Sequence, residues 1–239
     1  MEKWVVAQKK ADFKKMGLEY GIDPVIARLI HNRDIVGEAA IKRYLYGTLC
    51  DIPSHWEMKG MEEAVPLLMK MIEDGNLIEI IGDYDVDGVL SAYILYEGLR
   101  FLGARVTYRF PRRTEEGYGL HPAMIEEVAE EEVDTILTCD NGISARDVIA
   151  FAKEKGMTVI VTDHHEVPYT QEGSKRVSLL PPADVILNPK QEDDPYPYKS
   201  LCAAAVAWKL VLGLFDRCEV PEEERPNFLD MVALATLCD

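Results

Sequence analysis

The chain has 239 residues, of which 48% are hydrophobic and 28% charged, a globular composition that argues against a disordered acidic protein. Lys and Arg number 26 against 42 Asp and Glu, so the net charge is −16. Taken alone, this acidity argues against a nucleic-acid-binding surface, because such surfaces are usually basic. No run approaches the roughly 18 consecutive apolar residues of a membrane span, and the N-terminus lacks the apolar segment of a signal peptide. We therefore expect a cytoplasmic protein with no membrane partner.

The first 55 residues are expected to form a small helical arm. Apolar residues recur there at helical spacings, and Gly17, Gly21 and Pro24 interrupt the pattern. Pro53 and Ser54 then indicate a boundary. The sequence therefore predicts an arm over residues 1–55 and a second domain over residues 56–239.

From about residue 60, amphipathic segments alternate with short apolar runs. This alternation predicts βαβ units, and hence an α/β fold with a doubly wound, mainly parallel sheet flanked by helices. Helices are expected over residues 62–73, 89–102, 122–131, 144–155, 201–214 and 228–237. Strands are expected over residues 77–81, 105–110, 135–139, 157–162 and 183–187, and surface loops over residues 167–182 and 188–199.

Three of the predicted strands end in groups of polar side chains. They run into residues 82–88 (GDYDVDG), residues 140–142 (DNG) and residues 163–166 (DHHE). Because ligands of parallel sheets bind beyond the carboxyl ends of the strands, we expect the three groups to meet there. Oxygen ligands with one or two imidazoles suit Mn²⁺ or Mg²⁺, and can also suit Zn²⁺. So many carboxylates favour two ions over one, an arrangement that can serve phosphoryl displacement.

Each group has a structural alternative when it is taken alone. Residues 83–88 resemble the start of an EF-hand loop, but that loop needs a Glu six residues after its Gly, and Ile94 stands there. The same acidic turn can simply complement the dipole of the following helix, and residues 140–142 are an ordinary turn sequence. Cys139 is interpreted as a core residue rather than a nucleophile. Two adjacent histidines in a chain with only five are harder to explain structurally, so the three groups together favour a metal site.

The same residues resemble the motifs of the DHH phosphoesterase superfamily. Residues 82–88 are similar to its first motif, residues 140–142 to its second, and residues 163–165 to the signature that gives the family its name. Further similarities indicate the RecJ branch, which comprises single-strand-specific 5′→3′ exonucleases of DNA repair and recombination. These lie at residues 111–113, 116–120, 161–166, 188–190 and, as the fourth motif, 233–239.

The resemblance implies a site for two ions, manganese or magnesium. The metal ligands that it implies are Asp85, Asp87, Asp140 as the bridging residue, His164 and Asp239, with Asp83 a ligand or a close neighbour of the ions. The catalytic residues would be Asp140, Asp163, which orients the histidines, and His165, which contacts the scissile phosphate. We also expect Arg109, Arg112 and Arg113 to bind substrate phosphates, with a solvated loop as the alternative, and Tyr84 and Tyr118 to stack on bases, with plain packing as the alternative.

These observations lead us to expect metal-assisted phosphodiester hydrolysis with single-stranded DNA as the partner. Two alternatives stay open: a phosphatase, pyrophosphatase or nanoRNase for small nucleotide substrates, and a non-catalytic replication scaffold. Family members continue past the fourth motif into further domains, so we expect residues 1–239 to be the N-terminal catalytic part of a longer protein. Residues 202–204 (CAA) stand where the family more often has a Gly-containing turn, and we expect this difference to affect packing only.

Overall fold

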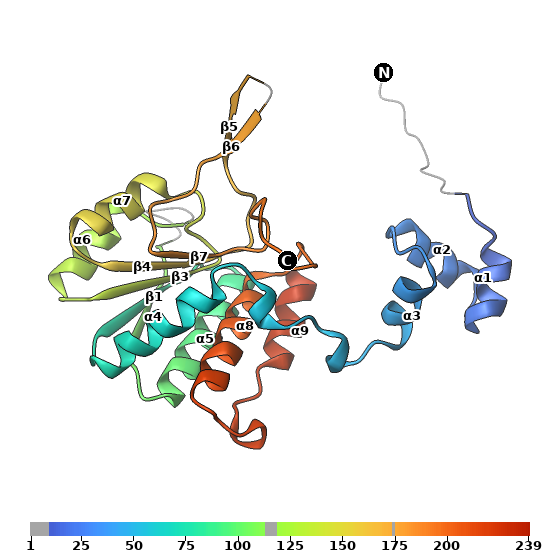
Figure 1. The fold of residues 1–239 in the computed structure, drawn as a ribbon, viewed down its shortest axis with the longest axis horizontal. Coiled ribbons are helices and arrows are strands. Elements are labelled where there is room, and N and C mark those ends of the chain that lie inside the picture. Colours follow the sequence, from blue (N-terminus) through green and yellow to red (C-terminus); the bar gives the residue numbers. More distant parts are fainter. Residues whose placement is uncertain (1–9, 113–118, 174) are drawn as a thin grey trace. The chain divides into compact units, whose positions relative to one another are not determined.

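The computed structural model describes residues 10–112, 119–173 and 175–239, and the chain divides into two compact units, residues 1–53 and 54–239 (Figure 1). The described part of the smaller unit contains α1 (Phe13–Tyr20), α2 (Pro24–Asn32), α3 (Glu38–Tyr46) and the 3₁₀ turn Leu49–Asp51. The side chains of Asp12 and Asp23 cap the first two helices by accepting from backbone amides. Tyr20, Ile30 and Ile41 form the core of this helical arm.

The two units differ in charge. Residues 1–53 hold nine Lys and Arg against seven Asp and Glu, a balance of +2. Residues 54–239 hold 17 against 35, a balance of −18. The acidity of the chain therefore belongs entirely to the larger unit.

The larger unit is built on a five-stranded sheet in the order β2-β1-β3-β4-β7, in which every neighbouring pair is parallel. Its strands are continuous apolar or β-branched runs for the most part, as expected for a sheet buried on both faces. They are β1 (Leu77–Ile81), β2 (Arg105–Arg109), β3 (Thr135–Cys139), β4 (Thr158–Thr162) and β7 (Val185–Leu187). The predicted strands and the predicted parallel sheet are confirmed.

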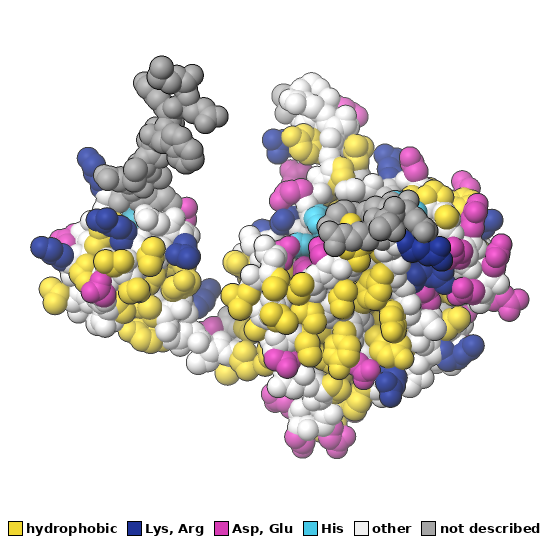
Figure 2. Space-filling view, turned by 180° about the vertical axis from the view of Figure 1, so that it is seen from behind, with side chains coloured by type: hydrophobic (Ala, Val, Ile, Leu, Met, Phe, Trp, Pro, Cys, Tyr) yellow, Lys and Arg dark blue, Asp and Glu magenta, His cyan; other side chains and the backbone are white. Residues whose placement is uncertain are grey.

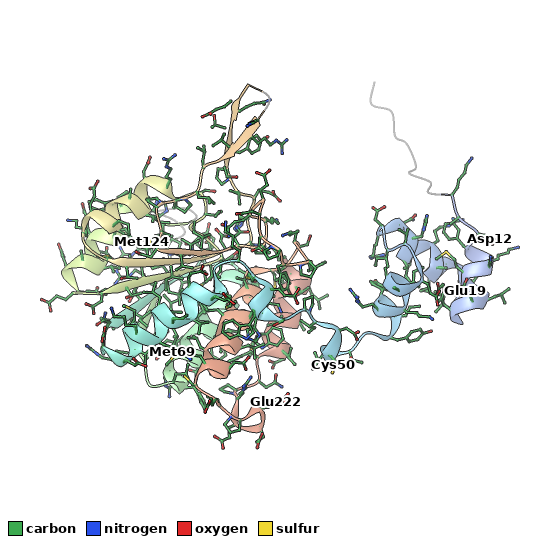
Figure 3. The ribbon with its side chains drawn as sticks, viewed as in Figure 1. Asp12, Glu19, Cys50, Met69, Met124 and Glu222 are labelled. Atoms are coloured by element: carbon green, nitrogen blue, oxygen red, sulfur yellow. The ribbon has the colours of Figure 1, made fainter. Side chains whose placement is uncertain are left out.

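Helices cover both faces of the sheet (Figure 1). One face packs against α4 (Met61–Glu73), α5 (Val86–Phe101), α8 (Ala203–Arg217) and α9 (Leu229–Cys238), and the other against α6 (Pro122–Glu130) and α7 (Arg146–Glu154). Met69 and Met124 lie on these two opposite sides (Figure 3). A Cβ at Gly98 would come within 2.6 Å of Val211, so glycine permits the close packing of α5 on α8. Two 3₁₀ turns, His55–Glu57 and Glu222–Glu224, complete the described helices.

One expectation for the chain between β4 and β7 is wrong. Residues 167–182 were expected to be a surface loop, but they contain an antiparallel hairpin, β5 (Tyr169–Glu172) and β6 (Lys175–Ser178). All eight strand residues are exposed. Strands are predicted from alternating apolar and polar residues, and a hairpin with no buried face lacks this alternation. The sequence therefore gave no indication of strands here. Residues 188–199 contain no helix or strand, as predicted.

The larger unit also buries a lysine on α8. Lys209 is only 2% exposed, and its ammonium lies 4.9 Å from the ring centre of Tyr196 and 5.6 Å from that of Trp208. Burial lowers the pKa of Lys209 to about 8, although Glu57 acts in the opposite direction. The charged form of Lys209 is therefore less favourable in the folded protein than in the unfolded chain, although it remains the main form at neutral pH.

We predict that Lys209→Met stabilises the protein most at neutral pH. Because the pKa of Lys209 is lower in the folded than in the unfolded state, its charge costs stability below about pH 8, and this cost disappears as the pH rises toward the unfolded pKa near 10.4. The variant should gain on the order of 2 kcal/mol in free energy of unfolding at pH 7, and its advantage over wild type should shrink by pH 10. Urea denaturation of both proteins measures this, and an advantage that grows with pH would contradict it.

Candidate metal centre

The predicted site residues meet at the carboxyl ends of β1, β3 and β4. Around them lies a cavity of about 500 Å³, whose lining includes Asp83, Asp85, Asp140, Asp163 and His165. Figure 2 shows histidine and acidic side chains side by side on one face of the larger unit. The expectation that three separate strand ends converge on one edge is therefore met.

The turn after β1 fixes two of the acids. Asp85 is the N-cap of α5, where its Oδ1 accepts from the amide of Gly88 at 2.9 Å, and it remains exposed. Asp83 is 5% exposed, and its Oδ1 accepts from the amide of Tyr84 at 2.7 Å. Burial raises the pKa of Asp83. A Cβ at Gly88 would lie 2.3 Å from the backbone of Asp83, so only glycine lets this turn fold back on itself.

Asp87 is held by the N-terminus of a different helix. The two oxygens of its carboxylate accept from the amides of Ala203, at 2.6 Å, and Ala204, at 2.8 Å, in the first turn of α8. A helix N-terminus favours an anion in this position. Asp87 is 3% exposed, and burial raises its pKa although both amides act to lower it.

This contact corrects the expectation that residues 202–204 affect packing only. Their backbone amides orient a predicted metal ligand, so the start of α8 belongs to the site. Backbone donors carry no side-chain signature, which is why the sequence did not reveal them. The available signal was a run of small residues at the start of an apolar helix.

The turn after β3 places Asp140 in the left-handed region, with φ 61°. Aspartate tolerates this conformation better than most residues do. Asn141 anchors the turn by donating from Nδ2 to the carbonyl oxygens of Ile81 and Cys139, and thereby joins the ends of β1 and β3. Asp140 is 3% exposed, and burial raises its pKa to about 7.

The turn after β4 is organised by the carboxylate of Asp163, which is 1% exposed. Its Oδ2 accepts from the amide of Ile143 at 2.9 Å, and its Oδ1 from the amides of His164 and His165 and from Nδ1 of His165 at 2.7 Å. Burial alone would raise the pKa of Asp163, but these donors hold it below its ordinary value. The hydrogen bond from Nδ1 in turn raises the pKa of His165 to about 9. Asp163 thus fixes the ring of His165 and favours its protonated form.

A buried asparagine supports the same turn from the neighbouring strand. Asn188, directly after β7, donates from Nδ2 to the carbonyl oxygen of His165 at 3.0 Å. The sequence singled out residues 188–190 as similar to the RecJ branch but assigned them no role. The structure shows that Asn188 positions the backbone of residues 163–165.

His164 lies at the centre of the cluster. Its Nε2 is 3.0 Å from Oδ1 of Asp140 and 3.6 Å from Oδ2 of Asp87, and its Nδ1 is 3.7 Å from Oδ2 of Asp239. Burial alone would lower the pKa of His164, but the carboxylate of Asp140 raises it.

The donors around His164 fit divalent cations. Nε2 of His164 is buried and makes no hydrogen bond of good geometry in the described structure, although it lies within ion-pair distance of Asp140 and Asp87. The candidate ligand atoms form two groups, each within 4.8 Å: Asp140, His164 and His165, and Asp87, His164 and Asp239. Asp83 and Asp85 line the cavity but belong to neither group. Oxygen and imidazole donors of this kind suit Mn²⁺ and Mg²⁺.

The arginine expected to bind phosphate at the end of β2 is engaged elsewhere. The guanidinium of Arg109 forms ion pairs with Glu79, Glu127 and Glu131, which tie β1 and α6 to the edge strand. Because its donors are taken up by these carboxylates, we leave Arg109 out of the phosphate-binding residues.

The remaining predicted substrate residues are only partly described. Arg112 is exposed just beyond β2, and Tyr84 is half-buried. Arg113 and Tyr118 lie outside the described residues.

Two alternatives from the sequence are also decided. Cys139 is fully buried, and burial raises the pKa of its thiol, which confirms it as a core residue. The acidic turn connects a strand to a helix, which excludes an EF-hand.

Comparison with known proteins identifies the family. The model of the DHH family, N-terminal domain, matches residues 77–236. The chain belongs to the DHH family. This match covers the sheet and every described turn of the candidate centre apart from Asp239.

Curated relatives are single-stranded-DNA-specific RecJ exonucleases. The chain is 38% identical to that of Haemophilus influenzae over 226 residues, which are 90% of this chain and 37% of the relative. It is 34% identical to that of Bacillus subtilis over 238 residues, which are 99% of this chain and 28% of the relative. The chain thus spans about a third of the length of the curated relatives it matches.

Solved structures give the same result. A crystal structure of exonuclease RecJ bound to manganese matches with a TM-score of 0.63 and 34% identity, over 75% of this chain and 43% of that one. RecJ from Thermus thermophilus in complex with Mn²⁺ matches with a TM-score of 0.67 and 28% identity, over 94% of this chain and 30% of that one. The expected resemblance and fold are confirmed.

We predict that Ala203→Pro weakens metal binding while leaving the fold intact. Proline is favoured at the first position of a helix, and Cys202 before it is already extended, with φ −74° and ψ 163°. The substitution therefore removes little besides the amide that holds Asp87. Loss of one hydrogen-bond donor to the carboxylate of Asp87 should lower the affinity for Mn²⁺ by about tenfold or more. Isothermal titration calorimetry measures this affinity.

Ala203→Gly is the matched control, since it removes the methyl group and keeps the amide. It should bind Mn²⁺ much as wild type does. Equal Mn²⁺ affinities for the proline and glycine variants would contradict the role assigned to this amide.

Proposed function

We propose that this chain is the metal-bearing catalytic part of a RecJ-type exonuclease that hydrolyses phosphodiester bonds of single-stranded DNA in the 5′→3′ direction, in DNA repair and recombination. The observation that carries the proposal is the convergence of His164 with Asp87, Asp140 and Asp239 in a chain similar to RecJ over most of its length. A non-catalytic scaffold would have no need to keep this cluster.

Two ions, Mn²⁺ or Mg²⁺, are the proposed cofactors. His164 belongs to both groups of donors, Asp87 and Asp239 complete one group, and Asp140 and His165 complete the other. We keep Asp83 and Asp85 as ligands or close neighbours of the ions. Divalent cations at such a centre supply charge that offsets the developing charge on the phosphate, and they polarise water.

The protein's own residues orient the phosphate and hold the site in shape. Asp163 accepts from Nδ1 of His165 and favours the protonated ring, and in that form Nε2 would donate to a non-bridging phosphate oxygen. Asn188 and Ile143 fix the same turn through backbone contacts. We propose Arg112 and Arg113 as further contacts to substrate phosphates.

The bases of the strand require contacts of their own. Tyr84 lies within the first motif, and Tyr118 precedes Gly119, which lines the cavity. We propose both as stacking partners for bases, a sequence-tolerant contact.

We also propose that the protein works in the cytoplasm. Within the described chain, no helix combines the length and the apolar character needed to cross a bilayer.

Removing one central ligand should abolish hydrolysis. We predict that Asp140→Ala and His164→Ala each lower the rate at least a hundredfold, because His164 belongs to both donor groups and Asp140 is its nearest carboxylate, while circular dichroism stays that of the wild type. The assay uses end-labelled single-stranded and duplex DNA and a dinucleotide, in Mn²⁺, Mg²⁺ and EDTA. Asp230→Asn is the control, since Asp230 is an exposed acid on α9.

The same assay separates the proposal from its alternatives. An exonuclease degrades the single strand and spares the duplex, and EDTA stops it. Preference for the dinucleotide would favour a small-substrate phosphoesterase, and product formation in EDTA would contradict metal-assisted hydrolysis.

A further inference from the structure

We propose that the hairpin formed by β5 and β6 is a binding arm for the single-stranded DNA substrate, in which Tyr169 stacks on a base and Arg176 contacts a phosphate. This inference rests on the proposed function and names a part of the substrate site outside the metal centre. Four observations carry it: the hairpin covers no part of the core, its two faces differ in chemistry, Tyr169 and Arg176 are already paired, and the hairpin begins four residues after His165.

The hairpin stands where a packing element is expected. Neighbouring parallel strands are usually joined by a helix that covers the sheet, but residues 163–184 join β4 to β7 with this ribbon instead. Figure 1 shows the hairpin projecting away from the sheet. Each of its strand residues is exposed, so packing does not explain its presence.

The two faces of the ribbon are chemically different. Successive strand residues point to opposite faces, and the pairing sets Tyr169 opposite Ser178 and Gln171 opposite Arg176. One face therefore carries an aromatic ring, an amide, a guanidinium and a hydroxyl, with no acid. The other face carries Glu172 opposite Lys175, together with Thr170 and Val177.

Tyr169 and Arg176 form a preassembled pair. The guanidinium carbon of Arg176 lies 4.4 Å from the centre of the Tyr169 ring, and Tyr169 is 51% exposed. A guanidinium on one side of the ring leaves the other side for a base, while the edge donors of Arg176 can reach a phosphate. Ring and cation are the two groups with which proteins bind single strands regardless of sequence.

The hairpin begins a short stretch of chain after His165. Tyr169 follows His165 by four residues, so their Cα atoms are at most about 14 Å apart. The base of the ribbon is fixed there by a hydrogen bond from the amide of Leu179 to the carbonyl oxygen of Pro168, at 2.7 Å. At roughly 3.4 Å per phosphate along a stacked strand, this upper limit corresponds to at most about four nucleotides.

The test compares the two faces of one ribbon in the full chain. Tyr169→Ala and Arg176→Ala should each weaken binding of a fluorescent 20-nucleotide single strand at least about fivefold, measured by anisotropy in an Asp140→Asn background that prevents degradation. Arg176→Ala should also lower the slope of log K against log salt by about one, since it removes one phosphate contact.

Two matched variants serve as controls. Lys175→Ala removes the same charge from the adjacent residue on the opposite face and should bind as wild type does. Tyr169→Phe keeps the ring and should do likewise. The inference is overturned if Lys175→Ala weakens binding as much as Arg176→Ala, if Tyr169→Ala binds normally, or if the wild-type chain does not bind the strand.

Cleavage separates this inference from the proposed function. With an intact metal centre in Mn²⁺, Tyr169→Ala should lower the ratio of kcat/KM on the 20-mer to that on a dinucleotide, which offers the hairpin fewer bases and phosphates. Failure of the wild-type chain to cleave either substrate would contradict the proposed function. The comparison of Arg176→Ala with Lys175→Ala in the binding assay would still test whether the hairpin binds the strand.

Discussion

The burial of like charges at one edge of the sheet is the constraint on which the rest of this structure depends. The carboxylates of Asp83, Asp87, Asp140 and Asp163 are each at most 5% exposed, and burial raises the pKa of the first three. Asp163 alone has enough donors to hold its pKa low. Divalent cations are the natural partners for the others, since they stabilise the charged carboxylates that burial disfavours.

Backbone groups as well as side chains hold these carboxylates in place. Parallel strands bring three turns to one edge, the N-terminus of α8 holds Asp87, and Asn141 and Asn188 join adjacent turns. The net charge of −16 is compatible with binding DNA at one local site. The acidity is confined to the larger unit, and it excludes a generally basic DNA-coating surface without excluding a local site that binds phosphate through cations, His165 and the hairpin.

The sequence predicted the parallel sheet and the convergence of the three motifs, because apolar runs and ligand-type residues at their ends are local signals. It missed contacts that depend on tertiary structure. The amides of Ala203 and Ala204 have no side-chain signature, the exposed hairpin has no apolar periodicity, and the pairing of Arg109 with acids from β1 and α6 requires the fold to be known. Only the first of these could have been suspected, from small residues at the start of an apolar helix.

The most direct test of the central claim is anomalous diffraction at the manganese edge from crystals of this chain grown with Mn²⁺. The account predicts two peaks about 3.5–4 Å apart, with Asp140 between them and with His164, Asp87 and Asp239 as ligands. Absence of manganese at this edge of the sheet, with His164 and Asp140 hydrogen-bonded directly to each other, would contradict it.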